Sequence, residues 1–253
     1  MSPETRREAA RRRIAEKRAA EERARAQERR RRQTLVGGVA AAVVVVLAVV
    51  VVIAVQSART STSPDAAVPA NTTDGGTAFA VGPADAPVTV DVYEDFLCPA
   101  CRQFEAAAGA TLAELAADGT AQVRYHPIAI LDRASTDDYS TRALNAAAAV
   151  ADAAGTEAFL DFHDALFTEQ PAEGGPGLTD ARLVELAAGV GAAGPDVEEA
   201  ITGLVYGDWT REVTDAASRA GVSGTPTVLV DGAPLQDRSA EGLRAAVAEA
   251  QEG

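Results

Sequence analysis

The chain is 253 residues long and 47% hydrophobic, which is enough to bury the core of one or two domains. Its charge is divided unevenly: residues 1–34 carry 13 basic and 6 acidic side chains, whereas the remaining 219 residues carry 10 and 31. Because an acidic surface repels phosphate, this composition argues against a nucleic-acid-binding domain, and we expect no nucleic-acid partner.

A long apolar segment follows the basic N-terminal part. Residues 35–55 are all apolar or glycine, and as a helix they would span about 30 Å, the thickness of a bilayer core. No amphipathic helix of a soluble core is apolar on every face over that length. Arg29–Arg32 precede the segment and Arg59 alone follows closely, so the positive-inside rule keeps residues 1–34 cytoplasmic. We therefore predict a single-pass anchor in the cell membrane with an extracytoplasmic C-terminal domain.

A cleaved signal peptide is the alternative reading of this segment, since Ala54–Ala58 contains small residues. The apolar region of a signal peptide is normally about 7–15 residues long, so an uncleaved anchor is favoured. Residues 56–78 are rich in Ser, Thr, Pro and Gly, which is typical of a flexible linker. Such a linker would hold the following domain near the membrane and leave its orientation free.

Residues 79–253 have the length of one domain. Residues 87–93 alternate with valines on one face, which predicts a half-buried strand. Residues 98–117 carry apolar side chains at spacings of three and four and predict a helix. Residues 121–131 predict a second strand. The first part of the domain therefore has the order strand, helix, strand.

The second part of the domain is mostly helical. Residues 137–220 predict helices broken by glycine and proline clusters, and 227–230 predict a strand. Asp231-Gly232 is typical of a hairpin turn, and residues 240–250 predict a closing helix. The whole order indicates an α/β domain with a helical insertion at about 137–220.

Two cysteines, Cys98 and Cys101, stand where the first predicted helix begins. Pro99 suits the first helical position, which leaves Cys98 at the N-cap, close to free backbone N–H groups and the positive end of the helix dipole. Both effects favour the thiolate and lower the pKa of Cys98. Cys101 lies one turn further in and is more shielded. We therefore predict a redox-active pair in which Cys98 attacks and Cys101 resolves the mixed disulfide.

Other uses of the cysteines fit less well. A disulfide across so short a loop removes little chain entropy and would stabilise the fold little. Structural zinc generally needs four ligands, and the chain offers two cysteines and two histidines without finger-like spacing. We predict no metal site and no cofactor. His126 and His163 are interpreted as packing or capping residues.

Three stretches resemble the DsbA-type thioredoxin-fold thiol–disulfide oxidoreductases: Val81–Val90 (VGPADAPVTV), Glu94–Cys101 (EDFLCPAC) and Gly221–Thr227 (GVSGTPT). The resemblance spans about residues 79–253, and Phe159–Phe167 looks like the aromatic insertion helix of that family. It implies an α/β thioredoxin fold with a helical insertion, here preceded by a single transmembrane helix.

The resemblance also implies roles for single residues. Pro99 and Ala100 complete the active-site motif between the cysteines. Pro226 would be the family's cis-proline beside the disulfide, and the backbone of Thr225 would pair with an extended substrate peptide. A trans proline that opens a strand is the alternative for the Thr225-Pro226 pair.

Two positions depart from the family pattern. Strongly oxidising members carry a histidine where this chain has Ala100, so its oxidising power is expected to be lower. Many thioredoxin-fold proteins place a buried acid six residues before the first cysteine, where this chain has Val92. Glu94 points to the same face and is a possible proton relay. A solvated surface role for Glu94 and Asp95 fits the sequence equally.

The leading hypothesis is an enzyme that introduces disulfides into exported proteins, whose thiols are its substrates. A quinone-linked membrane oxidoreductase is the family's expected partner for recharging the pair. A disulfide reductase or isomerase stays open, because such relatives also place Thr before the proline, as at Thr225. A non-catalytic binding or chaperone module is a third hypothesis. Copper delivery fits less well, since those relatives have three residues between the cysteines.

Overall fold

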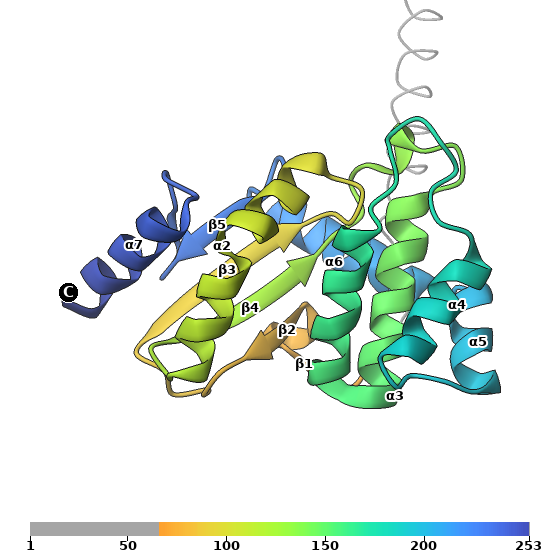
Figure 1. Ribbon diagram of the computed structural model, residues 1–253, viewed down its shortest axis with the longest axis horizontal. Helices are drawn as coiled ribbons and strands as arrows, with labels where there is room; N and C mark the ends of the chain where they lie inside the picture. The colour runs from red at the N-terminus through yellow and green to blue at the C-terminus, as the bar shows by residue number, and fades with distance from the viewer. Residues whose placement is uncertain (1–65, 253) are drawn as a thin grey trace, which may run out of the picture. The chain divides into compact units, whose positions relative to one another are not determined.

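A six-stranded sheet forms the centre of the computed structural model, which describes residues 66–252 (Figure 1). The strand order is β1-β2-β4-β3-β5-β6, and only the β3–β4 pair is parallel. The strands are β1 (Thr72–Thr73), β2 (Ala78–Val81), β3 (Val88–Glu94), β4 (Ala121–Pro127), β5 (Thr227–Val230) and β6 (Ala233–Pro234). The predicted cytoplasmic segment, the predicted transmembrane helix and residues 56–65 of the predicted linker lie outside the described residues. Within residues 66–252, no helix has the length and hydrophobicity needed to cross a membrane.

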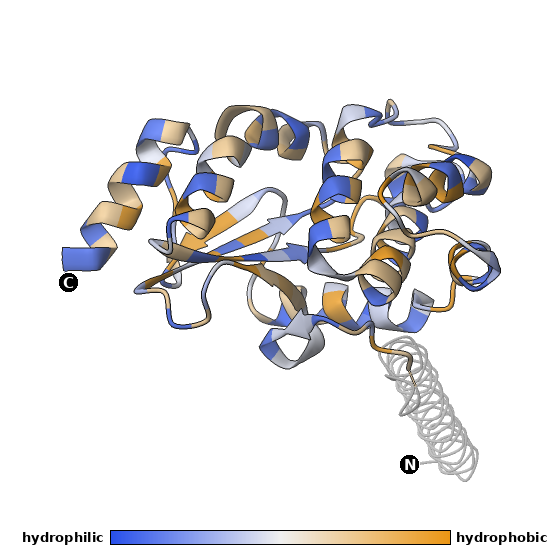
Figure 2. Ribbon diagram, turned by 60° about the horizontal axis from the view of Figure 1, so that its bottom comes forward, coloured by the Kyte–Doolittle hydropathy of each residue, from blue (hydrophilic) through white to orange (hydrophobic). Residues whose placement is uncertain are grey.

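Helices cover both faces of the sheet. Helix α2 (Pro99–Ala117) packs on β4 and against α7 (Ala240–Glu252), which lies over β3 and β5. Helix α6 (Gly207–Arg219) contacts β4 from behind the sheet as drawn in Figure 1. Helices α2 and α7 alternate hydrophilic and hydrophobic residues, as expected for helices with one buried side (Figure 2).

The predicted helical insertion is built around one long helix. Helix α3 (Tyr139–Thr168) contacts α4 (Asp180–Gly189), α5 (Pro195–Thr202) and α6, and it bends at Gly155, whose φ of 87° is left-handed. Its first half is rich in alanines that are fully buried, so neighbouring helices can approach closely. The result is the α/β thioredoxin-like arrangement that the sequence indicates, with the helices between β4 and β5.

The structure differs from the sequence-based boundaries at two places. The second predicted strand was expected to reach residue 131, but β4 ends at Pro127. The backbone N–H groups of Ile130 and Leu131 donate to the side chain of Asp95 instead of to a neighbouring strand. The shorter strand therefore leaves a loop that is held by a carboxylate.

The folded part also begins before residue 79, where the predicted linker ends. Thr72 and Thr73 pair with β2, and the indole N–H of Trp209 donates to the carbonyl of Gly76 at 2.7 Å. The Ser/Thr/Gly composition that indicated a linker does not reveal these backbone contacts, because they use no apolar side chain of the segment.

Aromatic side chains join the insertion to the sheet. Phe79 of β2 and Phe159 of α3 are fully buried and stack with their ring centroids 4.1 Å apart, and Trp209 meets Phe79 edge-on at 5.9 Å. Buried aromatic pairs contribute both apolar area and ring geometry to stability. This cluster fixes α3, and with it the loop before α4, against the sheet.

We predict that Phe159→Ala lowers the free energy of unfolding by about 3–5 kcal/mol, because it leaves a cavity between α3 and β2. The control is Val205→Ala, a truncation at a side chain that is 47% exposed, which should change stability by less than about 0.5 kcal/mol. Urea denaturation of the full chain measures both. Equal effects of the two variants would contradict this account of how the insertion is docked.

Candidate active site

The cysteine pair lies where β3 gives way to α2. Cys98 is the N-cap of α2, with extended backbone angles (φ −73°, ψ 114°), and Pro99 occupies the first helical position. The backbone N–H of Cys101 donates to the carbonyl of Cys98 at 3.1 Å and closes the first turn. The sequence-based placement of Cys98 at the start of the helix is confirmed.

The two thiols have opposite environments. Cys98 keeps 6% of its surface exposed, whereas Cys101 is fully buried. The hydrogen bond from the Cys101 thiol is the largest effect that lowers the pKa of Cys98, and a contact with Thr225 and the N–H groups of Ala100 and Cys101 add to it. Burial opposes these effects, and the resulting pKa of Cys98 is about 5. Burial, the hydrogen bond to Cys98 and the charge of Glu94 all raise the pKa of Cys101 far above its usual value. At neutral pH the reduced pair is therefore a thiolate at Cys98 beside a protonated Cys101.

The segment before β5 lies against this thiolate. The Thr225–Pro226 peptide bond is cis, as the resemblance implied. In its protonated form the thiol of Cys98 donates to the carbonyl oxygen of Thr225, 3.4 Å away. The hydroxyl of Thr227 donates to the carbonyl of Gly224 at 2.7 Å and closes the turn. Thr225 and Pro226 are thus brought together with the cysteines, and peptide pairing at Thr225 stays a prediction.

Asp95 is a buried carboxylate that holds the active-site loop. Its Oδ1 accepts hydrogen bonds from the N–H of Leu97 and the hydroxyl of Ser140, and its Oδ2 accepts from the N–H groups of Ile130 and Leu131. Burial raises the pKa of Asp95 and the four hydrogen bonds lower it, because they favour the charged form. Burial outweighs them, and the resulting pKa is about 6. The solvated role considered for Asp95 is wrong, since the side chain joins β3, the loop after β4 and the start of α3.

Gln170 is a second residue that holds the loop, and no pattern in the sequence indicates it. It follows the end of α3, and its side-chain amide donates to the carbonyls of Phe96 and Cys98, both at 3.0 Å. A single polar residue after a predicted helix is indistinguishable from a surface residue. The contact exists because the insertion brings the end of α3 back to the cysteines.

The side chain of Glu94 is also buried, so the interpretation of Glu94 as a solvated surface residue is wrong as well. Its carboxylate bonds to Nε2 of the buried His163, while Val92, at the position of the family's acid, lies in the apolar core. Burial would lower the pKa of His163, but the facing Glu94 and the neighbouring Asp164 raise it well above the usual value. Glu94, Glu105 and His163 each present one ligand atom within 4.8 Å of the others, and these residues could hold a metal ion.

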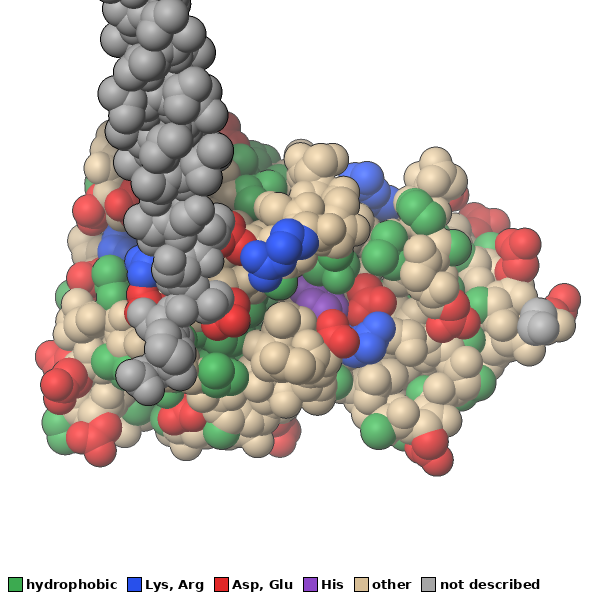
Figure 3. Space-filling model, turned by 180° about the vertical axis from the view of Figure 1, so that it is seen from behind, with side chains coloured by type: hydrophobic (Ala, Val, Ile, Leu, Met, Phe, Trp, Pro, Cys, Tyr) green, Lys and Arg blue, Asp and Glu red, His purple; other side chains and the backbone are tan. Residues whose placement is uncertain are grey.

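His126 lies away from the cysteines. In the β3–β4 register, Asp91 and Tyr93 face Arg124 and His126, on the side of the sheet opposite Val92. Asp91 accepts from Nε of Arg124 at 2.7 Å and lies 2.9 Å from Nε2 of His126, whose ring stacks on Tyr93. Burial raises the pKa of Asp91, but His126 and Arg124 lower it by more, so the pKa lies below its usual value. Figure 3 shows a histidine among acidic and basic side chains on the back of the molecule. His126 is thus a packing residue of an ion-pair network.

Comparisons with known proteins agree with this geometry. The family model described as thioredoxin matches residues 74–249, more than half of the chain, and the chain therefore belongs to this family. The reduced disulfide bond oxidoreductase DsbG from Mycobacterium tuberculosis is 38% identical, with a TM-score of 0.61, over 69% of this chain and 87% of its own. Oxidised DsbA of the same organism is 37% identical, with a TM-score of 0.61, over 70% and 93%. The resemblance to DsbA-type thiol–disulfide oxidoreductases is confirmed.

Two curated relatives are much longer than this chain and match it over part of their length. The serine/threonine-protein kinase PknE from Mycobacterium tuberculosis is 35% identical over 155 residues, which are 58% of this chain and 27% of the kinase. The Na(+)/H(+) antiporter NhaA 3 from Salinispora tropica is 34% identical over 151 residues, which are 60% of this chain and 21% of the antiporter. The chain thus matches only about a quarter of the length of these relatives.

We predict that alkylation of Cys98 becomes faster as the pH rises through about 5 and then levels off, because the thiolate is the reactive form. The measurement is the rate of iodoacetamide labelling against pH on the reduced full chain. In Cys101→Ala, which removes the main hydrogen bond to the sulfur, the midpoint should move to higher pH. A midpoint near 9 in the parent protein would contradict the structural assignment of the thiolate.

We predict that Asp95→Asn lowers the free energy of unfolding by about 2–4 kcal/mol, because an amide leaves buried backbone donors without an acceptor. It should also remove a pH dependence. The folded-state pKa of Asp95 is raised from 3.8 to about 6, so the folded protein binds more protons and the parent's stability falls as the pH rises across that interval. Urea denaturation at several pH values measures both effects. The control is Asp161→Asn, at an exposed carboxylate of α3, which should change neither the free energy of unfolding nor its pH dependence.

Proposed function

We propose that this member of the thioredoxin family is a thiol–disulfide oxidoreductase that introduces disulfides into exported proteins. The observation that carries the proposal is the asymmetry of the two thiols, a thiolate of low pKa at Cys98 and a shielded, protonated Cys101. A thiol of low pKa is a good leaving group, so a disulfide that contains it is readily reduced by a substrate dithiol.

The exchange proceeds in two steps. A substrate thiolate attacks the sulfur of Cys98 in the oxidised pair, forms a mixed disulfide and releases Cys101, which takes up a proton. A second substrate thiolate then attacks the substrate sulfur of the mixed disulfide, forms the substrate disulfide and releases Cys98 as a thiolate. The substrate loses two electrons and the pair gains them. The greater exposure of Cys98 and the burial of Cys101 support this division of roles.

Thr225 and Pro226 are the proposed edge for substrate binding. The carbonyl of Thr225 lies beside the sulfur of Cys98, at the point where β5 begins. An extended peptide that pairs with the backbone of Thr225 would place its own cysteine next to that sulfur. This arrangement supports recognition of the peptide main chain rather than of particular side chains.

Glu94 is the proposed proton relay for Cys101. Its support is electrostatic: the charge of Glu94 contributes to the raised pKa of Cys101, and the carboxylate is shielded from solvent. In the relay, Glu94 would pass to Cys101 a proton that it receives from His163, whose Nε2 bonds to its carboxylate, when the disulfide opens.

The location and the recharging partner are proposals based on the sequence. The apolar segment 35–55 and the arginines before it support a single-pass anchor with an extracytoplasmic domain. A quinone-linked oxidoreductase of the membrane would accept the electrons from the reduced pair. The thiols of exported proteins would then be the substrates.

We predict that the reduction potential lies clearly above the value of thioredoxin, about −270 mV, toward the value of a strongly oxidising DsbA, about −120 mV. The measurement equilibrates the full chain in glutathione buffers of graded composition and follows the fraction of oxidised pair. The potential should be raised because the low pKa of Cys98 stabilises the reduced form.

A potential near −270 mV would favour the reductase or isomerase alternative, and refolding of a scrambled substrate would separate those two. A Cys98→Ser/Cys101→Ser variant that replaces the parent protein fully in cells would favour the binding or chaperone module. Loss of function in that variant, together with a raised potential, supports the oxidase.

A further inference from the structure

Three ionisable side chains from three elements converge behind the cysteine pair. Glu94 ends β3, Glu105 lies on the second turn of α2, and His163 lies near the end of α3. Their ligand atoms lie within 4.8 Å of one another. Glu94 and His163 are buried and bonded to each other, and Glu105 is partly buried. Oxygen and imidazole donors therefore face one small volume.

Two oxygen atoms of this group have no partner among the described residues. Oε2 of Glu94 and Oε1 of Glu105 are inaccessible to solvent and accept no hydrogen bond within the part of the chain that the structure describes. A buried carboxylate oxygen without a donor is costly, and native proteins rarely leave one unsatisfied. The two carboxyl groups lie within hydrogen-bond reach of each other, so one proton or one cation held between them would supply the missing partner of both oxygens.

The charges of the group are also unbalanced. Two carboxylates face a single imidazole, and Asp164, which contacts Nδ1 of His163, adds a third acid. Burial and the charge of Glu94 raise the pKa of Glu105 to about 8. The excess negative charge must be neutralised by a proton or by a bound cation.

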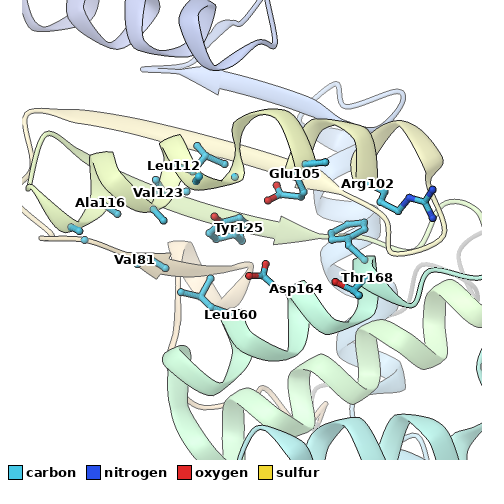
Figure 4. A pocket seen from close by; sticks show the side chains of 17 residues that line it. Val81, Arg102, Glu105, Leu112, Ala116, Val123, Tyr125, Leu160, Asp164 and Thr168 are labelled. Atoms are coloured by element: carbon cyan, nitrogen blue, oxygen red, sulfur yellow. The ribbon is translucent and has the colours of Figure 1, made fainter.

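A pocket gives access to the group from outside. It has a volume of about 750 Å³, lies between α2 and α3 above β4, and includes Glu105, Tyr125 and Asp164 in its wall. Figure 4 shows Glu105 and Asp164 projecting into the pocket from opposite helices, with Tyr125 between them. Arg102, at one end of the pocket, points away from both acids. An ion that enters by this pocket meets Glu105 before it meets Glu94 and His163.

We propose that Glu94, Glu105 and His163 form a binding site for a divalent transition-metal ion. Zn²⁺ and Mn²⁺ are the ions that suit two carboxylates and one imidazole. The imidazole argues against Mg²⁺ and Ca²⁺, which take oxygen ligands. The absence of sulfur from the group argues against Cu⁺. Three protein ligands leave a position open toward the pocket for water or for the exposed Asp164.

A proton and a metal ion compete for the same carboxylates. A bound cation would replace the shared proton and supply the missing partners of both oxygens. None of the three ligands is a cysteine, so the site needs no sulfur donor.

The test uses Zn²⁺ and Co²⁺ on the full chain carrying Cys98→Ser and Cys101→Ser, since free thiols would bind both ions. Competition with a chromogenic chelator should give one Zn²⁺ per chain. Adding Glu105→Gln should weaken the affinity by at least about tenfold, because a ligand is lost. The matched control is Glu114→Gln, at an exposed carboxylate of the same helix, which should bind as the parent does.

Two further measurements separate loss of the site from loss of the fold. Without metal, Glu105→Gln should melt no lower than its parent, because the amide keeps the size of the side chain and is neutral at every pH. In the parent, which carries only the two cysteine substitutions, Co²⁺ should shift the NMR signals of the His163 ring. Absence of a bound ion in the parent, unshifted His163 signals, or unchanged affinity in Glu105→Gln would each overturn the proposal.

Discussion

The carboxylate of Asp95 is the constraint on which the active site depends. It lies between the end of β3 and the first turn of α2, and its four hydrogen bonds reach the active-site loop, the loop after β4 and the start of α3. Burying a carboxylate is unfavourable unless its oxygens are satisfied, so these donors must be in place together. The helical insertion is thereby coupled to the position of Cys98, since Ser140 of α3 bonds to the same oxygen as the loop.

Glu94 and Asp95 are neighbours in sequence but divide two tasks between them. Because side chains alternate along an extended backbone, the two carboxylates point to different surroundings. Asp95 meets backbone N–H groups and fixes geometry, whereas Glu94 meets His163 and brings charge close to Cys101. Both acids are buried, and the exposure that their charge suggested is prevented by the insertion, which covers this end of the sheet.

The features that were predicted from the sequence depend on interactions between near neighbours. The start of α2 follows from Pro99 and the apolar spacing after it. The order of the thiol pKa values follows from the hydrogen bond between the two thiols, the burial of Cys101 and the N-cap position of Cys98. The cis bond before Pro226 came from family resemblance alone. The contacts that were missed join distant residues: Gln170 reaches the carbonyl of Cys98 over 72 positions. Hydrophobic periodicity reports which face of an element is buried, but it does not report which polar side chain meets which carbonyl.

The same limit applies to the prediction of metal ligands. A count of cysteines and histidines does not show which carboxylates from other helices and strands lie near a histidine in the fold. This limit applies less to the thiolate, since most of its stabilisation comes from near neighbours. The Cys101 thiol lowers the pKa of Cys98 most, the backbone N–H groups of Ala100 and Cys101 add to it, and Thr225 is the contributor that is distant in the sequence. A histidine at position 100 would add one more donor to an arrangement that the start of the helix already provides. Ala100 therefore removes a reinforcement of the thiolate rather than its cause, and the direction of electron transfer depends on how strongly Cys101 and the helix start hold that charge.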